Sequence, residues 1–272
     1  MSARDQSAGV SLLNTLVVIA VGASLAHAML SDQDAALSRL GATQNLAQAT
    51  ALANGGIASV ATALQRDFRE APEADHLREP WAQAAQQQIE LDFGTFEVEI
   101  VDARGRFDLN ALTPVNLAEQ RLFAALLVAL DLPKALGAQI SRIIAQNGPL
   151  RHPDDLRRYG ISDGDLERLT PYLGTFQTRG AVNVNAADAP VLSALFGNAE
   201  LAQSLSARRS AKGFLDASDL AAFGAILPSL GSFASDSFDI RAVVRVGQAK
   251  VEIHRRLTRD PRNGQVRSSS IQ

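Results

Sequence analysis

The feature that most constrains this chain is an uninterrupted apolar run between residues 10 and 30. It follows a short polar leader, residues 1–9, and it carries no formal charge if His27 is neutral. Because an α-helix rises about 1.5 Å per residue, this run would span roughly 30 Å as a helix, which is the thickness of the hydrocarbon core of a bilayer. The run therefore predicts a single transmembrane helix with the bulk of the chain outside the membrane.

The sequence leaves three fates open for this run. It can remain as a permanent anchor, or it can be removed as a secretory signal, since Ala26-His27-Ala28 has the small-x-small pattern of a signal peptidase site. In the third, the leader ends at Gly9, and the apolar helix is retained and begins at Val10. A polar leader that ends in glycine before an apolar helix resembles the leader of type IV pilins and type II secretion pseudopilins, which a prepilin peptidase cuts after that glycine.

The residue at the fifth position of such a processed chain is Asn14. Most pilin-like proteins have glutamate there, but the K-type minor pseudopilins characteristically lack it. A carboxylate in an apolar helix bundle is costly unless a cation, such as a neighbouring subunit's N-terminal amine, pairs with it. Asparagine needs no such neighbour, which suits a subunit at the end of a filament.

The composition excludes several classes of function. The formal net charge of −3 gives no global reason to expect nucleic-acid binding, and the absence of cysteine excludes disulfides and thiolate metal sites. No carboxylate is combined with histidine or serine in a recognisable catalytic motif, and no glycine-rich phosphate loop follows a strand, so we expect no enzyme. We expect Asp102 and Asp108, on either side of Gly105, to form hydrogen bonds in a turn.

The sequence before and after the middle of the chain predicts a long helix, which continues the apolar run, and an antiparallel sheet. From Ser31 to about Glu70, apolar residues recur at steps of three, four and seven, so the helix is expected to continue out of the membrane, with Gly55-Gly56 as a weak point or a close-packing site. Apolar residues alternate over 89–93 and 96–100, and the phase flips across Gly94-Thr95 as a tight hairpin or a bulge would require, which predicts two strands or one bent strand. The same alternation predicts strands over 238–246 and 249–253, with a turn at Gly247-Gln248. We expect one antiparallel sheet packed on the helix.

Between the two pairs of strands lies a segment that we call the helical insertion, residues 107–235. It contains two similar halves, which open at Asn110 and Asn185, and both asparagines are expected to be helix N-caps. Three later residues of each half also correspond and are separated by the same intervals. They are Leu150, Leu156 and Gly160 in the first half and Phe214, Leu220 and Gly224 in the second.

Each half resembles a helix-hairpin-helix unit of the kind that many nucleic-acid-binding proteins carry. Neither half has the Gly-apolar-Gly turn that meets a phosphate, and neighbouring aspartates oppose the local positive charge of Arg157, Arg158, Arg208, Arg209 and Lys212. A structural module is therefore favoured. A membrane-tethered DNA-binding protein of an uptake system is the alternative, for which DNA retention would depend on salt.

Patterns along the chain, taken in order, resemble the K-type minor pseudopilins of type II secretion systems over nearly its whole length. Besides Gly9 and Asn14, they are Glu79-Pro-Trp81-Ala, Asp102-Ala-Arg-Gly105-Arg106-Phe-Asp-Leu-Asn110, Val182-Asn-Val-Asn185-Ala, Val191-Leu-Ser-Ala-Leu195 and Ser235-Asp-Ser-Phe238-Asp-Ile-Arg. The resemblance implies an α+β fold in which a pilin-like long N-terminal helix packs on a small antiparallel sheet, with a large inserted all-helical domain containing two helix-hairpin-helix-like repeats.

The expected domains follow from this resemblance. They are a leader (1–9), a transmembrane helix (10–30), a first pilin-like part (31–106), the helical insertion (107–235), the last pilin-like strands (236–262) and a flexible tail (263–272). The resemblance implies cleavage by prepilin peptidase, methylation of the new N-terminus, and assembly with I- and J-type minor pseudopilins at the tip of a pseudopilus. It also implies contact with membrane lipid and the secretion platform, in the inner membrane with the bulk of the chain in the periplasm.

No cofactor is expected, and no nucleic acid is expected as a partner. Some members of the family that this chain resembles bind calcium in the inserted domain. Oxygen ligands could come from Asp154, Asp155, Asp163 and Asp165, although helix capping and solvated surface explain these residues more simply. The sequence therefore leaves the metal open.

Overall fold

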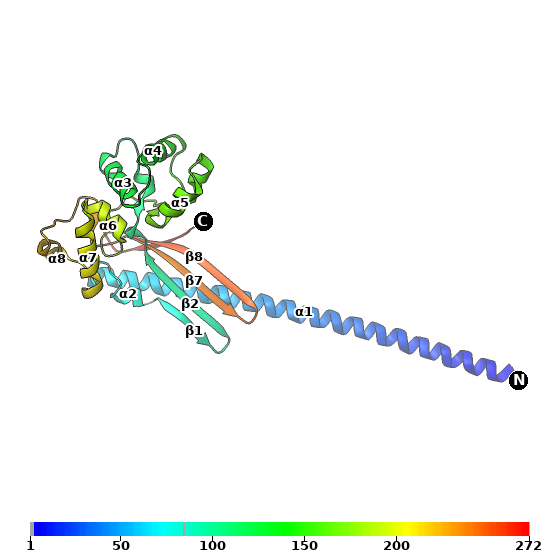
Figure 1. Ribbon diagram of the computed structural model, residues 1–272. Coiled ribbons are helices and arrows are strands. Elements are labelled where there is room, and N and C mark those ends of the chain that lie inside the picture. The colour runs from blue at the N-terminus through cyan, green and yellow to red at the C-terminus, as the bar shows by residue number, and fades with distance from the viewer. Residues whose placement is uncertain (1–2, 84, 272) are drawn as a thin grey trace.

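The protein is built on one long helix that carries the rest of the chain at its C-terminal end (Figure 1). The computed structural model describes residues 3–83 and 85–271, and the side chains of all of these except residues 3–14, 86 and 87. The helix, α1 (Ala3–Glu70), runs far beyond the folded part towards the N-terminus.

Among the described side chains of α1, those of its C-terminal part are packed on the rest of the chain. Ala49, Ala53, Ile57, Val60 and Leu64 follow helical steps of three and four, and all of them are buried against the sheet. The apolar residues of the preceding turns, Leu37, Leu40 and Leu46, are at least half exposed. The apolar periodicity predicted one continuous amphipathic helix, and the structure shows that its apolar residues divide into a packed set and an exposed set.

Gly56 is a close-packing site, one of the two roles expected for Gly55-Gly56. A Cβ atom at Gly56 would lie 2.5 Å from Cζ of Phe96, whereas one at Gly55 would meet nothing within 4 Å. The helix continues without a break through both glycines. The missing side chain of Gly56 therefore lets the sheet approach the helix.

The sheet has five antiparallel strands in the order β1-β2-β7-β8-β9. The strands are β1 (Gln86–Leu91), β2 (Gly94–Asp102), β7 (Ser237–Val246), β8 (Ala249–Arg259) and β9 (Val266–Ser270). The predicted turn at Gly247-Gln248 is confirmed by the pairing of Val246 with Ala249, and Gly247 has a φ of 54°. Central strands β2 and β7 are joined through the whole helical insertion.

The first hairpin turn lies two residues earlier than predicted. Leu91 pairs with Gly94, so the turn consists of Asp92 and Phe93 and not of Gly94 and Thr95. Gly94 is a glycine for another reason, because a Cβ atom there would lie 1.8 Å from the carbonyl oxygen of Arg245 on β7. Gly94 was predicted as a turn residue, but it is a glycine because strands β2 and β7 approach each other closely at this position.

The prediction of a flexible tail at 263–272 was wrong for most of that segment. Residues Val266–Ser270 form β9, which pairs with Arg255–Arg259 of β8. Strand β8 extends six residues beyond the alternating apolar pattern that ends at Ile253, and its last part would otherwise be an unpaired edge. Pairing of backbone groups, which does not require apolar side chains, explains why the pattern missed this strand.

The core between α1 and the sheet includes Trp81, the sole tryptophan of the chain, which lies in α2 (Pro80–Gln83). Its ring is fully buried and packs edge-on against Phe238 of β7, with 5.0 Å between ring centroids. Trp81 therefore anchors this short helix in the core.

The helical insertion leaves the sheet at the end of β2 and returns at the start of β7, where Asp102 pairs with Phe238. Its helices are α3 (Leu117–Ala129), α4 (Ala135–Asn147), α5 (Asp163–Leu169), α6 (Ala189–Phe196), α7 (Ala199–Lys212) and α8 (Ala217–Ala222), with the 3-10 helix η3 (Pro153–Tyr159). It has a hydrophobic core of its own, separate from the core of the sheet. The α+β class, with a long N-terminal helix packed on an antiparallel sheet and a helical region, is confirmed.

Candidate functional site

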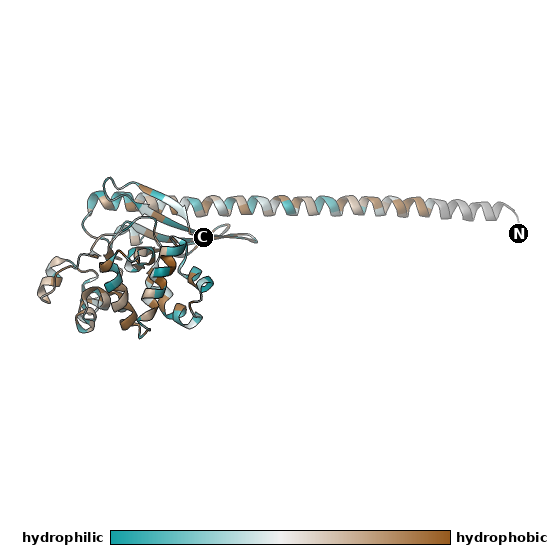
Figure 2. Cartoon of the chain, turned by 90° about the horizontal axis from the view of Figure 1, so that it is seen from above, coloured by the Kyte–Doolittle hydropathy of each residue, from teal (hydrophilic) through white to brown (hydrophobic). Residues whose placement is uncertain are grey.

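The exposed part of α1 is the first candidate site. Among the described residues, one helix is long and apolar enough to cross a membrane by its length and composition, and its most apolar stretch is unburied. Leu16, Val18, Ile19 and Leu25 are each more than half exposed, and Figure 2 shows the apolar residues of this stretch beyond the folded part. Such a surface needs lipid or protein partners, because apolar area of this size is rarely left to water.

The residues predicted for processing all lie on this helix. Gly9, Val10 and Asn14 have helical backbone within α1, and the side chains of this part of the helix lie outside the described residues. The positions of the three residues are thus known as backbone positions only. Cleavage after Gly9 and the role of Asn14 stay predictions.

A second candidate region is the junction where the insertion meets the sheet. Asp102 at the end of β2 accepts hydrogen bonds from the hydroxyl of Ser235 (2.5 Å) and from Nδ2 of Asn183 (2.7 Å), besides the backbone N–H of Arg104. Burial raises the pKa of Asp102 to about 7, against the hydrogen bonds from Ser235 and Asn183, which lower it. One carboxylate therefore joins the sheet, the second half of the insertion and the returning chain.

Arg104, just after β2, joins the returning chain to the segment between the two halves of the insertion. Its guanidinium is buried, pairs with Asp236 at 2.5 Å, and donates to the carbonyl oxygen of Thr178. It also lies 4.1 Å from the centroid of the Phe176 ring, and Arg256 of β8 lies over the same ring at 4.7 Å. These contacts fix the orientation of the insertion on the sheet.

The turn around Gly105 has the simple role predicted for its carboxylates. Asp102 accepts the N–H of Arg104 at the start of one 3-10 turn, and Asp108 accepts the N–H of Asn110 at the start of the next. Both carboxylates are N-caps, and this geometry gives no support to acid–base chemistry.

The predicted role of Asn110 and Asn185 was wrong, because neither caps a helix. Nδ2 of Asn110 donates to the carbonyl oxygen of Leu150, and Oδ1 accepts the N–H of Leu150. Asn185 makes the same pair of bonds with Leu215. Each amide side chain therefore acts as a clamp that holds a distant backbone segment in the way a neighbouring strand would, which a local capping rule could not foresee.

The clamps also correct the predicted correspondence between the two halves. Leu150 is matched by Leu215 and not by Phe214, because these two leucines are held by the asparagines. The first half has one more residue between the clamp and the following helix, since the capping box is His152 with Asp155 in one half and Asp216 with Asp219 in the other. The equal intervals from Leu150 to Leu156 and from Phe214 to Leu220 suggested the wrong alignment of the two halves.

Other features are repeated in the two halves. Each is closed by a parallel pair of two-residue strands, β3 (Phe107–Asp108) with β4 (Leu173–Gly174) and β5 (Val182–Asn183) with β6 (Gly231–Ser232). Gly160 and Gly224 both adopt positive φ, at 83° and 67°, after the capped short helix. Helix α5 has no matching helix after Gly224 in the described chain.

Removing the clamp at Asn185 is expected to lower the stability of the protein more than removing the clamp at Asn110. Asn185→Ala should lower the free energy of unfolding by roughly 2–4 kcal/mol, because the N–H and C=O of fully buried Leu215 lose their partners. Asn110→Ala should cost about half as much, since Asn110 is only half-buried and water can replace it. Urea unfolding of the full-length chain in detergent, followed by circular dichroism, measures both, with exposed Asn54→Ala as control. Equal midpoints for Asn185→Ala and the parent would contradict the clamp.

The cations weighed as phosphate contacts are all engaged within the protein. Arg157 and Arg158 pair with aspartates of their own segment, and Lys212 pairs with Asp216 and Asp219. Arg208 pairs with Asp219, and Arg209 donates to the carbonyl oxygens of Val184 and Ala187. Structural ion pairs and caps account for these side chains, so the DNA-binding alternative gains no support from the geometry.

The aspartates weighed as calcium ligands are likewise divided among local roles. Asp155 completes a capping box, Asp165 accepts the hydroxyl of Ser162, and Asp163 pairs with Arg157. Accepting backbone N–H groups from His152 and Arg151 lowers the pKa of Asp155. Among the described residues, Asp154, Asp155, Asp163 and Asp165 form no group close enough to share one ion.

Sequence reasoning missed the buried polar residues of the junction. Arg259 on β8 is 3% exposed and pairs with Asp75 at 2.5 Å and with Asp67 at 3.3 Å. Arg104 and Asn183 were also not singled out as site residues. A buried arginine has the same local sequence signature as a surface one, and Arg259 lies beyond the alternating pattern that ends at Ile253, so no signal in the sequence marked it.

Comparison with known proteins decides the family. The model of the family described as type II secretion system (T2SS), protein K, matches residues 182–241. The type II secretion system protein K of Klebsiella pneumoniae is 30% identical over 228 residues, which cover 69% of this chain and 70% of that protein. This chain belongs to the type II secretion system protein K family.

Two further similarities agree with the protein K family. The type II secretion system protein K of Pseudomonas aeruginosa is 28% identical over 225 residues, which cover 69% of this chain and 68% of that protein. A chain in the crystal structure of the GspK-GspI-GspJ complex from enterotoxigenic Escherichia coli has a TM-score of 0.63 and 20% identity, with 86% of this chain and 98% of that chain covered. The latter supports the fold.

Membership of the protein K family confirms the expected role. The chain is a minor pseudopilin of a type II secretion system, a structural subunit and not an enzyme. The segment matched by the family model contains Asn183 and Ser235, whose side chains donate to Asp102 at the end of β2, and Asn185, which clamps Leu215 within the second half of the insertion.

Proposed function

We propose that this protein K family member assembles with I- and J-type minor pseudopilins at the tip of a pseudopilus through the exposed part of α1. The observation that carries the proposal is the exposure of α1 ahead of Ala49, where Leu37, Leu40 and Leu46 are each more than half exposed. Apolar side chains at these positions can pack with other helices. The complex of the related E. coli protein, named for GspK, GspI and GspJ, supports the same partners here.

We propose that the helix waits in the inner membrane before assembly, with the bulk of the chain in the periplasm. The apolar stretch of residues 10–30 supports this, together with the exposure of its described side chains. Cleavage by prepilin peptidase would occur between Gly9 and Val10, followed by methylation of the new N-terminus. Asn14 then replaces the usual glutamate, so this subunit needs no cationic neighbour above it.

We propose that the helical insertion caps the end of the pseudopilus. It gathers at the C-terminal end of α1, opposite the N-terminus (Figure 1), and it would hinder the addition of a further subunit on that side. We also propose that its halves descend from one helix-hairpin-helix-like unit, which their matching asparagine clamps, capping boxes and parallel strand pairs support. Contact with the inner-membrane secretion platform is part of the same proposal.

Assembly can be tested by co-expression with tagged I- and J-type minor pseudopilins and affinity purification in detergent. We expect the parent chain to co-purify at low and high salt alike, because apolar packing drives the contact. Leu40→Asp should abolish co-purification, whereas Leu117→Asp, at a leucine of α3 that is also more than half exposed, should leave it unchanged. Unaltered co-purification of Leu40→Asp would contradict assembly through this part of α1.

Processing can be tested separately by intact mass and terminal peptide mapping from cells that contain a prepilin peptidase. We expect the mature chain to begin at Val10 with an added methyl group, and Gly9→Val to accumulate uncut, with Gly22→Val as the control within the same helix. A chain that begins at Met29 would instead show removal of the apolar run as a signal, and an uncut parent chain would show a permanent anchor.

A further inference from the structure

Three buried carboxylates meet at the C-terminal end of α1. Asp67 lies in the last turns of the helix, and Asp75 and Glu79 lie in the linker between α1 and α2. They are 4%, 1% and 6% exposed, and one oxygen of each lies within 4.8 Å of those of the other two. Of the acidic and imidazole side chains in the described chain, these form the group with the spacing of ligands to one ion.

The hydrogen bonds of this cluster occupy one oxygen of each carboxylate. Oδ2 of Asp75 accepts from Nη2 of Arg259 and from the N–H of Ser235, and Oδ2 of Asp67 accepts from Nη1 of Arg259. Oε2 of Glu79 accepts from the indole of Trp81 and from a backbone N–H. Oδ1 of Asp75 is buried and has no hydrogen-bond donor among the described residues, an arrangement that is costly for a carboxylate oxygen.

The charges within the cluster do not balance. Were all three carboxylates ionised, the single guanidinium of Arg259 would leave two negative charges uncompensated in a buried place, and burial accordingly raises the pKa of each carboxyl. A divalent cation would balance the cluster and supply a partner for the orphan oxygen.

We propose that Asp67, Asp75 and Glu79 bind a divalent cation, and that calcium is the ion they suit. All ligands are carboxylate oxygens, which hard cations prefer, and two oxygens that bind one calcium at 2.3–2.6 Å lie at most about 5 Å apart. Arg259 holds one oxygen of Asp67 and one of Asp75, which leaves the other oxygen of each for the ion. Calcium tolerates flexible ligand geometry, whereas magnesium requires near-octahedral geometry.

The ion would tie the end of α1 to the helical insertion. The N–H of Asp75 donates to the carbonyl oxygen of Phe233, and the carbonyl oxygen of Asp75 accepts from Asn183. Any ligand that fixes Asp75 to Asp67 therefore also fixes the orientation of the insertion on the helix. This inference does not depend on the proposed assembly.

Trp81 provides a direct test on the full-length chain in detergent. Its indole donates to Glu79 at 2.8 Å and it is the sole tryptophan, so Tb³⁺ bound in the cluster should emit when the long-wavelength edge of tryptophan absorption is excited. We expect this emission to appear on titration with Tb³⁺ and to be displaced by Ca²⁺. Absence of such emission, or emission that Ca²⁺ does not displace, would overturn the proposal.

Isosteric variants assign the ion to these residues. Glu79→Gln and Asp67→Asn should each weaken Ca²⁺ affinity by at least about tenfold, because even residues that only support metal ligands typically cost that much when removed. Asp154→Asn with Asp163→Asn, in the insertion, should leave the affinity unchanged. Circular dichroism confirms that each variant is folded. Equal Ca²⁺ affinity in Glu79→Gln and the parent, or a loss in the control instead, would place the ion elsewhere and overturn the proposal.

Discussion

Arg259→Met is expected to lower the free energy of unfolding by about 3–5 kcal/mol, which is the cost of breaking a buried ion pair from one side. The guanidinium pairs with Asp67 and Asp75 and donates to the carbonyl oxygen of Ser235. Methionine fills a similar space but leaves two buried carboxylates without this partner. Because these residues come from α1, the linker and the returning chain, the loss should loosen all three together.

The measurement is urea unfolding of the full-length chain in detergent and chelator, so that no divalent cation replaces the lost charge. Arg245→Met is the matched control, since Arg245 lies on neighbouring strand β7 with an exposed side chain. The control should change the free energy by no more than about 0.5 kcal/mol. If both variants unfold at the same urea concentration as the parent, the ion pair of Arg259 does not support the fold.

Leu64→Ala is expected to cost about 2–5 kcal/mol, because it opens a cavity in the core between α1 and the sheet. Leu64 is fully buried in the same core as Trp81 and Phe238. Leu46→Ala changes the same residue type on the same helix, but Leu46 is 52% exposed and should cost no more than about 0.5 kcal/mol. Both substitutions change the helix propensity equally, so the difference between their free energies of unfolding measures the contribution of packing.

Fluorescence of Trp81 during urea unfolding measures this difference, because the sole tryptophan is buried in the affected core. Equal effects of the two substitutions would mean that α1 does not rest on the sheet along the face that contains Leu64. In contrast, Leu46→Asp is expected to leave the unfolding curve unchanged while it weakens any contact with partner helices.

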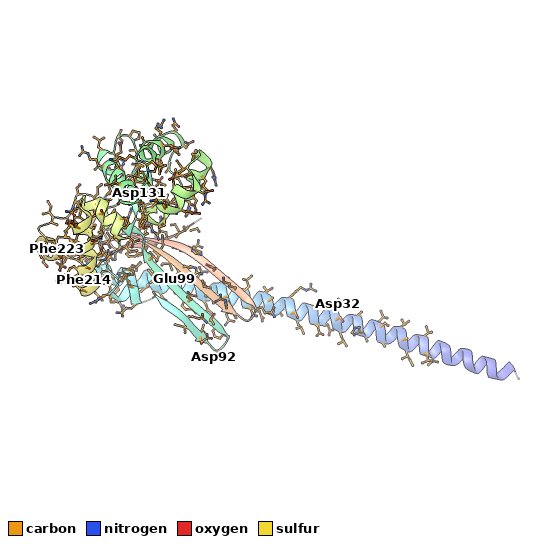
Figure 3. All side chains as sticks on the ribbon, in the orientation of Figure 1. Asp32, Asp92, Glu99, Asp131, Phe214 and Phe223 are labelled. Atoms are coloured by element: carbon orange, nitrogen blue, oxygen red, sulfur yellow. The ribbon has the colours of Figure 1, made fainter. Side chains whose placement is uncertain are left out.

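Exposed charges on the same scaffold are expected to contribute less to stability than the ion pairs of Arg259. Figure 3 shows Asp32 on the bare part of α1, Glu99 on the sheet and Asp131 on the insertion, all at the surface. The Arg241 side chain bridges Glu99 and Glu252 on the outer face of the sheet, where solvent screens the charges. Pairs of this kind typically contribute no more than about 1 kcal/mol, so the buried pairs of Arg259 dominate.

The sequence by itself determined the elements whose signal is periodic. The apolar run at 10–30 and the spacing of Ile57, Val60 and Leu64 predicted α1, and alternation around Gly247-Gln248 predicted the hairpin of β7 and β8. These patterns are local, because burial on one face of a helix or strand leaves the same mark on the chain whatever covers that face. The family resemblance rested on similarly local motifs.

Only the tertiary structure decided what the polar residues do. Asn110 and Asn185 looked like helix caps, yet each clamps a leucine distant in the chain, and Gly94 looked like a turn residue, yet it admits Arg245 of another strand. Strand β9 lacks an apolar alternation, because its place depends on the free edge of β8. Periodicity records which face of an element is buried, whereas hydrogen bonds and ion pairs between distant segments depend on where the whole chain brings those segments together.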